Sequence, residues 1–359
     1  MLESNRRTFL KTSAATLLAS PVISLAGNSN RPPVKVGQIG TKHAHAGGKM
    51  ATFRKFPELF EVVGVVENDP QQRNRMQSTD DYSGLTWLSE TELLSISDVQ
   101  GIAVETEIDD LLPVAEKCIQ AGKHIHLDKP AGTSLEHFRR ICRAADEKQL
   151  MIQMGYMYRS NPAFQFLFKA IRAGWLGDVH QVHCEMSKKV NDATRKELAQ
   201  YSGGSMFELG CHIIDAVVTV LGPPDRVTAF NKNTRPEYDN LMDNCLAVFE
   251  YPKATATIRS SVVEVSGGRR RQFIVCGNKG TIKIEPLEPH QLLLTLEEET
   301  EGFQKGTHQI DLPKSTGRYD GDLQHFAAVI RGEEPTFYST SHDIAVQEAL
   351  LKASEMPLA

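Results

Sequence analysis

The sequence lacks several features that would assign it to a protein class at once. It has six cysteines, and no two of them show the CxxC spacing of a zinc or redox motif. Its only tight basic run is Arg269 to Arg271, which we interpret as a solvated turn or the start of a strand, and its formal net charge is −5. No nucleic-acid partner is therefore expected. Most cysteines lie inside apolar runs and are predicted to be small buried residues: Cys118, Cys142, Cys184, Cys211, Cys245 and Cys276.

Residues 1–33 are interpreted as an export signal followed by a short linker. The arginine pair Arg6 and Arg7 precedes Phe-Leu-Lys and an apolar stretch that runs through Leu25. This order is typical of a twin-arginine signal, and the stretch is shorter than the about 20 residues that span a bilayer. We expect recognition by the twin-arginine export machinery and cleavage near Ala26. The protein would then be exported, periplasmic or extracytoplasmic, and would fold before export.

Short apolar strands alternate with amphipathic helices over residues 34–155. This alternation predicts a parallel sheet with helices on both faces, which is a Rossmann-like domain. The expected strands lie at 34–40, 61–67, 99–105, 123–127 and 150–155, and the expected helices at 44–56, 111–121 and 135–148.

Residues 156–359 follow a different pattern, in which extended runs succeed one another with short turns between them. Such a pattern predicts an α/β domain with a large, mostly antiparallel open sheet. Helices are expected at 162–173, 208–221, 322–331 and 344–355. After a first strand that follows "GWLGD", further strands are expected at 245–251, 254–265, 271–277, 280–286 and 291–297.

The expected helix at 208–221 carries a narrow polar stripe on an otherwise apolar surface. Glu208, His212, Asp215 and Thr219 are spaced four, three and four residues apart, so an α-helix would place them on one face. Buried ionisable groups need partners, which a polar ligand in a cleft would supply. The alternative is an internal network that only joins the two domains.

A second candidate, Lys129, follows directly on the expected strand at 123–127 in "HIHLDKPAG". Ligands of open parallel sheets bind beyond the carboxyl ends of the strands, and Pro130 restricts the turn that presents this lysine. A lone lysine after a strand is usually solvated. Together with the polar stripe, Lys129 becomes a candidate acid or charge stabiliser.

With these motifs in view, the chain resembles the glucose-fructose oxidoreductase, inositol dehydrogenase and rhizopine catabolism (Gfo/Idh/MocA) family. "HLDKPAG" is similar to the family's Glu-Lys-Pro motif with Asp128 in place of Glu, and "GGSMFELGCHIID" is similar to its Gly-Gly-x-x-x-Asp-x-Gly-x-His-x-x-Asp helix. "GWLGDV" and "CGNKGTIKIEP" also fit. The resemblance implies a Rossmann domain, a homodimer or homotetramer formed through the open sheet, and hydride transfer between a nicotinamide ring and a hydroxyl-bearing carbon of a sugar or cyclitol.

The resemblance also implies roles for particular residues. His212 stands at the position of the catalytic histidine and Lys129 at that of the catalytic lysine, which is also placed to contact the cofactor. Glu208 replaces the usual Asp, so its geometry differs by one methylene. Asp215, Arg159 and Tyr156 are candidate substrate-binding residues.

The nucleotide-binding loop "VGQIGTKHAHAGGK" departs from the family's Gly-x-Gly-x-x-Gly pattern. The aligned positions are Gly40, Lys42 and His45, so only the first glycine is kept. The missing glycines normally let the backbone approach the pyrophosphate and let the helix pack on the strand. Lys42 could offset this loss through its ammonium group, and Thr41 and His43 could donate hydrogen bonds at the helix N-terminus.

Two further positions bear on the cofactor. Glu67 ends the second expected strand, where an acidic residue binds ribose hydroxyls, and it favours NAD over NADP because it would repel the extra phosphate. Thr106 is kept where the family has Thr-Pro, but acidic residues surround it in "VETEIDD". These carboxylates would repel a pyrophosphate unless Lys42 or a histidine pairs with them; alternatively they are exposed loop residues. We assign no metal site, since a spacing of two between His43 and His45 is no metal signature by itself.

The sequence therefore predicts an exported NAD-dependent oxidoreductase acting on a sugar, polyol or similar hydroxy compound. One alternative is an NAD-dependent glycoside hydrolase or lyase that works by transient oxidation. Another is a binding protein that keeps the fold but has lost its cofactor.

Overall fold

The computed structural model describes residues 31–314 and 316–358. The expected export signal lies outside these residues, as does most of the linker that follows it. Within them, no helix combines the length and the apolar character needed to cross a membrane.

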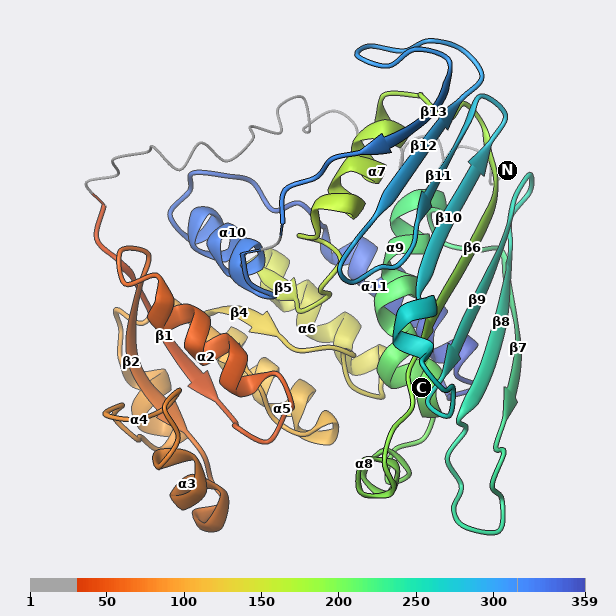
Figure 1. Ribbon diagram of the computed structural model, residues 1–359. Helices are drawn as coiled ribbons and strands as arrows, with labels where there is room; N and C mark the ends of the chain where they lie inside the picture. The colour runs from red at the N-terminus through yellow and green to blue at the C-terminus, as the bar shows by residue number, and fades with distance from the viewer. Residues whose placement is uncertain (1–30, 315, 359) are drawn as a thin grey trace. The chain divides into compact units, whose positions relative to one another are not determined.

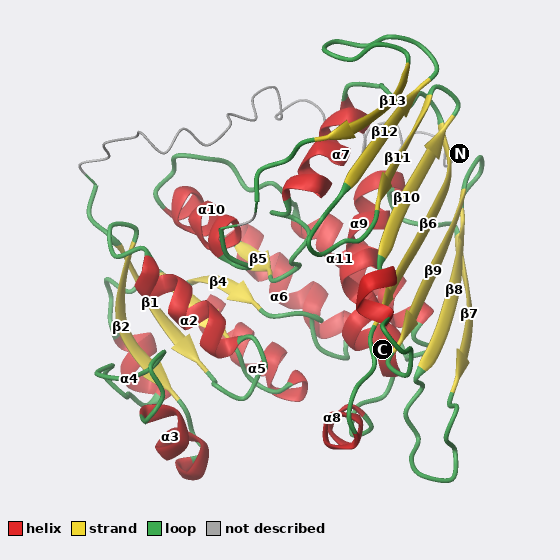
Figure 2. Ribbon diagram, viewed as in Figure 1, coloured by secondary structure: helices red, strands yellow, loops and turns green. Residues whose placement is uncertain are grey.

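The first half of the chain forms a five-stranded parallel sheet in the order β2-β1-β3-β4-β5 (Figures 1 and 2). The prediction of a parallel Rossmann-like sheet is thus confirmed. The chain reverses its direction across the sheet between β1 and β3, which makes the carboxyl ends of these two strands the expected ligand site. The strands are β1 (Val34–Ile39), β2 (Phe60–Val66), β3 (Gly101–Val104), β4 (His124–Leu127) and β5 (Ile152–Met154).

Two groups of helices cover the two faces of this sheet. α5 (Ile108–Gln120) and α6 (Leu135–Glu147) pack their apolar sides against one face. The other face packs against α2 (Ala46–Lys55) and α10 (Asp320–Ile330), whose Phe53 and Phe326 join one apolar cluster with β1 residues. Residues from the far end of the chain therefore complete the core of the N-terminal domain, although the predicted division assigns α10 to 156–359.

Two helices of this domain were not expected from the sequence. They are α3 (Pro70–Gln77), in which only Gln72 is buried, and α4 (Glu90–Ser95), which begins with a capping box between Ser89 and Glu92. Neither shows the long apolar periodicity by which the other helices were recognised.

The second half of the chain forms an eight-stranded sheet in the order β13-β12-β11-β10-β6-β9-β8-β7. Only β6 and β9 pair in parallel, so the prediction of a mostly antiparallel sheet is confirmed. Its strands are β6 (Val179–Ser187), β7 (Arg226–Lys232), β8 (Asn244–Glu250), β9 (Thr255–Ser261), β10 (Gln272–Gly277), β11 (Gly280–Ile284), β12 (Leu292–Leu296) and β13 (Gly306–Ile310).

Helices cover one face of this sheet, as Figure 1 shows. α7 (Pro162–Arg172), α9 (Cys211–Leu221) and α11 (Thr340–Ala353) contribute buried apolar residues to the same core as β6, β8 and β9. The short helix α8 (Asp192–Leu198) follows β6, and the arginine run 269–271 lies at the 3-10 turn η2 (Gly267–Arg270). Five of the six cysteines are buried, and Cys276 is partly exposed.

The expected helix at 208–221 differs from the prediction at its start. A π-helical turn, η1 (Met206–Gly210), contains Glu208 and runs into the α-helix α9. A π turn holds more residues than an α turn, so the α-helical spacing assumed between Glu208 and His212 does not hold there. Glu208 contacts Lys129, whereas Asp215 contacts Arg159.

Candidate functional site

The carboxyl ends of β1 and β3 approach each other closely at Gly40. This glycine has φ +89°, and a Cβ added there would lie 2.7 Å from the backbone of Glu105 and Thr106. Only glycine meets both conditions without strain. The one fingerprint glycine that the sequence retains is thus required by the close contact of the two loops.

A cavity of about 400 Å³ lies beside this contact. Gly40, Lys42, Glu67 and Thr106 all line it, so the structure brings together four of the residues that the sequence assigned to the cofactor. Glu67 lies at the end of β2, and its Oε2 accepts hydrogen bonds from the Thr41 amide at 3.0 Å and the Thr41 hydroxyl at 2.7 Å. The cavity therefore places a carboxylate where a ribose would meet the second strand.

Two of the four acidic residues around Thr106 have cationic partners: Glu107 contacts Lys42, and Glu105 contacts Lys49. Lys42 Nζ lies 3.2 Å from Glu107 and 3.4 Å from Asp69, at the cavity wall. These partners raise the pKa of Lys42, with the hydrogen bond to Glu107 as the largest cause. Lys42 thus neutralises carboxylates that would otherwise repel a phosphate.

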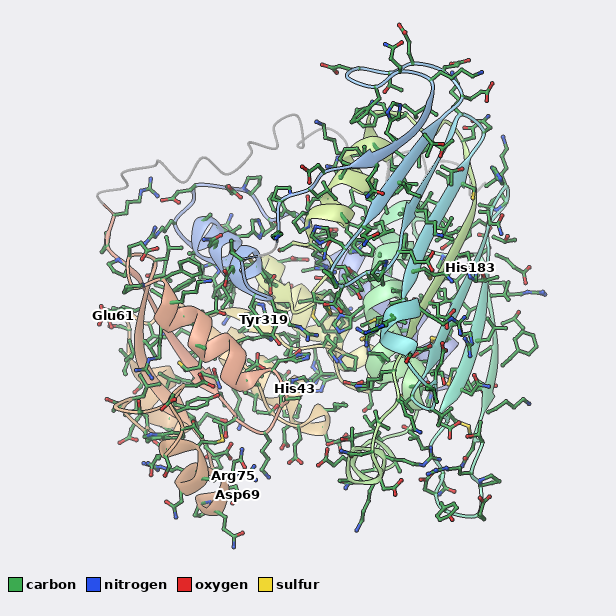
Figure 3. All side chains as sticks on the ribbon, viewed as in Figure 1. His43, Glu61, Asp69, Arg75, His183 and Tyr319 are labelled. Atoms are coloured by element: carbon green, nitrogen blue, oxygen red, sulfur yellow. The ribbon has the colours of Figure 1, made fainter. Side chains whose placement is uncertain are left out.

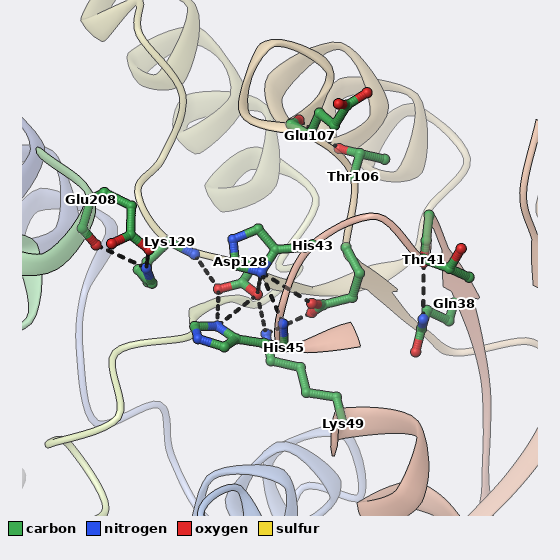
Figure 4. A network of polar contacts seen from close by, with 12 residues as sticks. Gln38, Thr41, His43, His45, Lys49, Thr106, Glu107, Asp128, Lys129 and Glu208 are labelled. Atoms are coloured by element: carbon green, nitrogen blue, oxygen red, sulfur yellow. Dashed lines mark hydrogen bonds and ion pairs between the residues drawn. The ribbon is translucent and has the colours of Figure 1, made fainter. Parts of the chain in front are cut away.

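A buried polar cluster lies at the start of α2 and the ends of β3 and β4 (Figure 4). His43 Nδ1 is 2.6 Å from Asp128 Oδ2, and His45 Nδ1 is 3.1 Å from the same oxygen. Lys49 Nζ contacts Glu105 at 2.6 Å and Asp128 at 3.2 Å, and all three side chains are fully buried. We call these five residues the loop cluster.

The charges of the loop cluster depend strongly on one another. Burial raises the pKa of Glu105 well above its usual value, and the neighbouring Asp128 raises it further. Burial also opposes the ionisation of Asp128, but the charges of Lys49 and His43 outweigh it and lower this pKa. Burial lowers the pKa of His45 to about 4, so its imidazole is neutral at physiological pH.

The catalytic candidates Lys129 and Glu208 contact each other directly. Lys129 Nζ donates to the Glu208 carbonyl oxygen at 2.9 Å and to its Oε1 at 3.0 Å. Burial favours the neutral carboxylic acid, but the charge of Lys129 prevails and lowers the pKa of Glu208 to about 2. The second carboxylate oxygen, Oε2, is buried without a hydrogen-bond partner among the described residues.

His212 is buried beside the same pair. Its ring makes edge contacts with Tyr156 and Tyr158, at centroid distances of 6.1 and 6.0 Å. Burial lowers its pKa well below the usual value, and the charge of Lys129 adds to this effect. Its Nδ1 has no hydrogen-bond partner in the described part of the chain. A neutral imidazole and a carboxylate oxygen, both without partners, suit a ligand that carries hydroxyl groups.

Asp215 and Arg159 form a separate interior ion cluster. Arg159 donates to Asp215 through Nε and Nη2, the latter at 2.6 Å, and also contacts Asp343 at 2.5 Å. Both side chains are at least nine-tenths buried. This geometry favours a role in fixing α9 against α11, and direct substrate binding by the two residues stays a prediction.

The sequence missed Lys49 and the position of His45 beside Asp128, and it placed Glu105 only among the acidic residues around Thr106. These residues come from segments far apart in the chain, and Lys49 lies in a helix where a lysine is normally expected to face solvent. The only signal was the unusual composition of the loop and of the acidic stretch after β3.

Comparison with known proteins agrees with this architecture. A family model described as an oxidoreductase family with an NAD-binding Rossmann fold matches residues 34–156, and the GFO/IDH/MocA C-terminal domain matches residues 164–283. An uncharacterized oxidoreductase of Schizosaccharomyces pombe is 24% identical over 345 residues, covering 91% of this chain and 92% of its own. The scyllo-inositol 2-dehydrogenase (NADP(+)) IolW of Bacillus subtilis is 31% identical over 158 residues, or 44% of each chain.

Solved structures share the fold. GenD2 from gentamicin A biosynthesis, determined in complex with NAD, superposes with a TM-score of 0.74 at 20% identity, covering 92% of this chain and 95% of its own. The fold and the two matched models together define an oxidoreductase with an NAD(P)-binding Rossmann domain. The chain belongs to the Gfo/Idh/MocA family.

Proposed function

We propose that the protein catalyses NAD-dependent hydride transfer to or from a hydroxyl-bearing carbon of a sugar, polyol or similar compound. The observation that carries this proposal is the buried group of Lys129, Glu208 and His212, in which Lys129 lies just beyond the carboxyl end of β4. Two of its polar atoms, Glu208 Oε2 and His212 Nδ1, have no partner among the described residues. Substrate hydroxyls would satisfy both atoms, which would otherwise remain costly to bury.

In this proposal, His212 takes the proton of the substrate hydroxyl as the carbon is oxidised. Its lowered pKa keeps the imidazole neutral and able to accept that proton. Lys129 stabilises the negative charge that develops on the oxygen, and Glu208 holds the ammonium group in place. The bound nicotinamide would supply the hydride acceptor or donor.

The residues around the 400 Å³ cavity fit the adenosine half of such a cofactor. Glu67 would bind the ribose hydroxyls and would repel a phosphate on the 2′ position, so we propose NAD rather than NADP. Thr41 and Lys42, together with the amides at the start of α2, are proposed to meet the pyrophosphate.

Mass spectrometry and absorbance of the folded, purified protein, followed by calorimetry with NAD and NADP, test this proposal. We expect bound nicotinamide or measurable NAD affinity, and weaker binding of NADP. Lys129→Ala and His212→Ala should each abolish turnover while they leave NAD affinity largely intact. A protein that is empty and binds neither dinucleotide would refute the redox function, and full activity in either variant would remove that residue from the chemistry.

We also propose export through the twin-arginine machinery and assembly as a homodimer or homotetramer. The arginine pair Arg6–Arg7 and the apolar stretch that follows it support export. Cell fractionation would test this by comparing the location of the full chain with that of the variant Arg6→Lys/Arg7→Lys. Exposed apolar side chains on β7 and β12, Phe230 and Leu293, support assembly through the eight-stranded sheet. Native mass spectrometry of the wild type and Phe230→Glu would show whether that contact exists.

A further inference from the structure

We infer that the loop cluster contains a binding site for one divalent transition-metal ion, with His43, His45, Asp128 and Glu105 as its ligands. One ligand atom from each of His43, His45 and Asp128 lies within 4.8 Å of the other two. Metal–nitrogen and metal–oxygen bonds of about 2.0–2.2 Å require ligand atoms roughly 3–4 Å apart. Small side-chain movements are therefore enough to close the site around an ion.

The fourth ligand is indicated by an unsatisfied atom. Glu105 Oε2 is buried and has no hydrogen-bond partner in the described chain, yet it lies only 3.9 Å from His43 Nδ1. Its other oxygen is held by Lys49. A buried carboxylate oxygen without a partner is costly, and a cation among the two imidazoles would satisfy it.

The charges near the site also favour a cation. Two buried carboxylates, Glu105 and Asp128, face a single buried ammonium group, that of Lys49. The next cation, Lys129, is already paired with Glu208 at 3.0 Å. With both carboxyl groups ionised and both imidazoles neutral, a divalent ion would meet two negative charges and one positive charge.

The site is accessible and is distinct from the proposed adenosine pocket. The side chains of His43 and His45 are 11% and 14% exposed, so an ion can enter from their side. None of the four ligands lines the 400 Å³ cavity. Two imidazoles with two carboxylates select zinc-like ions, because magnesium and calcium prefer sites made only of oxygen ligands.

The inference is tested by treating the folded protein with a chelator and titrating it with Zn²⁺ in a calorimeter. Mg²⁺ and Ca²⁺ serve as competitors, and the absorption spectrum of bound Co²⁺ reports on the ligand types. We expect about one ion per chain, and a loss of affinity of more than about 10-fold in both His43→Ala and His45→Gln. His183→Gln is the matched control and should keep the wild-type affinity. His183 lies on β6, apart from His43 (Figure 3), and its Nδ1 is 2.7 Å from the Thr257 hydroxyl.

No saturable Zn²⁺ binding to the wild type would overturn the inference, as would wild-type affinity in a folded variant with both histidines replaced. If one single variant fails to fold, the other decides the question. NAD calorimetry on the same samples separates this test from the proposed function, because Zn²⁺ binding and NAD binding can each fail alone.

Discussion

Replacing Lys49 by methionine should destabilise the protein severely. Its ammonium group is fully buried and contacts Glu105 at 2.6 Å and Asp128 at 3.2 Å. At an effective dielectric constant of about 20, a fully ionised pair at such a distance contributes roughly 5 kcal/mol of Coulomb energy, which offsets the cost of burying the charges. Methionine keeps much of the volume but removes the ammonium group from both carboxyl groups, and it leaves Asp128 with the histidines as partners.

We expect Lys49→Met to lower the free energy of unfolding by about 3–5 kcal/mol, the range measured when one partner of a buried pair is removed. Urea denaturation followed by circular dichroism would measure the change. The double variant Lys49→Met/Glu105→Leu should recover much of the lost stability, because it also removes the buried carboxyl group that Lys49→Met leaves without its ammonium partner. A loss below about 1 kcal/mol in the single variant would show that Lys49 does not hold the cluster together.

Three further predictions concern the loop and the catalytic histidine. Gly40→Ala should lower the free energy of unfolding more than Gly84→Ala. Both glycines have a positive φ, but of the two only Gly40 would place a Cβ against backbone atoms, at 2.7 Å. Equal losses in urea denaturation would contradict this. Lys42→Ala should weaken NAD binding in calorimetry roughly three- to tenfold. Lys35→Ala, which removes an exposed lysine paired with Asp98, should leave NAD affinity unchanged. If Lys42→Ala binds NAD as tightly as the wild type, Lys42 has no role in nucleotide binding. Burial lowers the pKa of His212, so its contribution to stability is present above about pH 6.5 and is lost as pH falls towards the folded-state pKa. Between pH 6.5 and 5 the wild type should lose up to about 1.4 kcal/mol per pH unit more than His212→Asn, and parallel stability profiles would argue against a neutral buried imidazole.

The pattern of apolar residues predicted most of the secondary structure, and its omissions have physical causes. β7 lies at an edge of its sheet and has no fully buried residue, and β13, at the other edge, alternates only between exposed and half-buried positions. Such strands are held by pairing with a neighbour and carry little apolar signal of their own. α3 is likewise almost entirely polar, and it is fixed at its start by Asp69.

The candidate site was predictable only where residues near in sequence act together. Motifs located Lys129, Glu208 and His212, and the structure brings Lys129 and Glu208 into direct contact. Their catalytic roles stay a proposal. The loop cluster could not be predicted, because the direction of Lys49 and the approach of Glu105 to His43 depend on how α2 packs over the sheet. The π turn was missed because the periodicity argument assumes a uniform α-helix.

The return of α10 to the first sheet has a consequence for the order of synthesis. Phe326 and Leu323 cover apolar residues of β1, among them Val34 and Val36, that are made almost 300 residues earlier. A ribosome-bound chain therefore exposes the part of that face which α10 covers until nearly the whole protein has been translated, while α2 can cover the rest earlier. Chaperones that recognise apolar surface could bind this part of the sheet for most of the time that synthesis takes. A chain truncated before α10 would expose the same part of that face permanently.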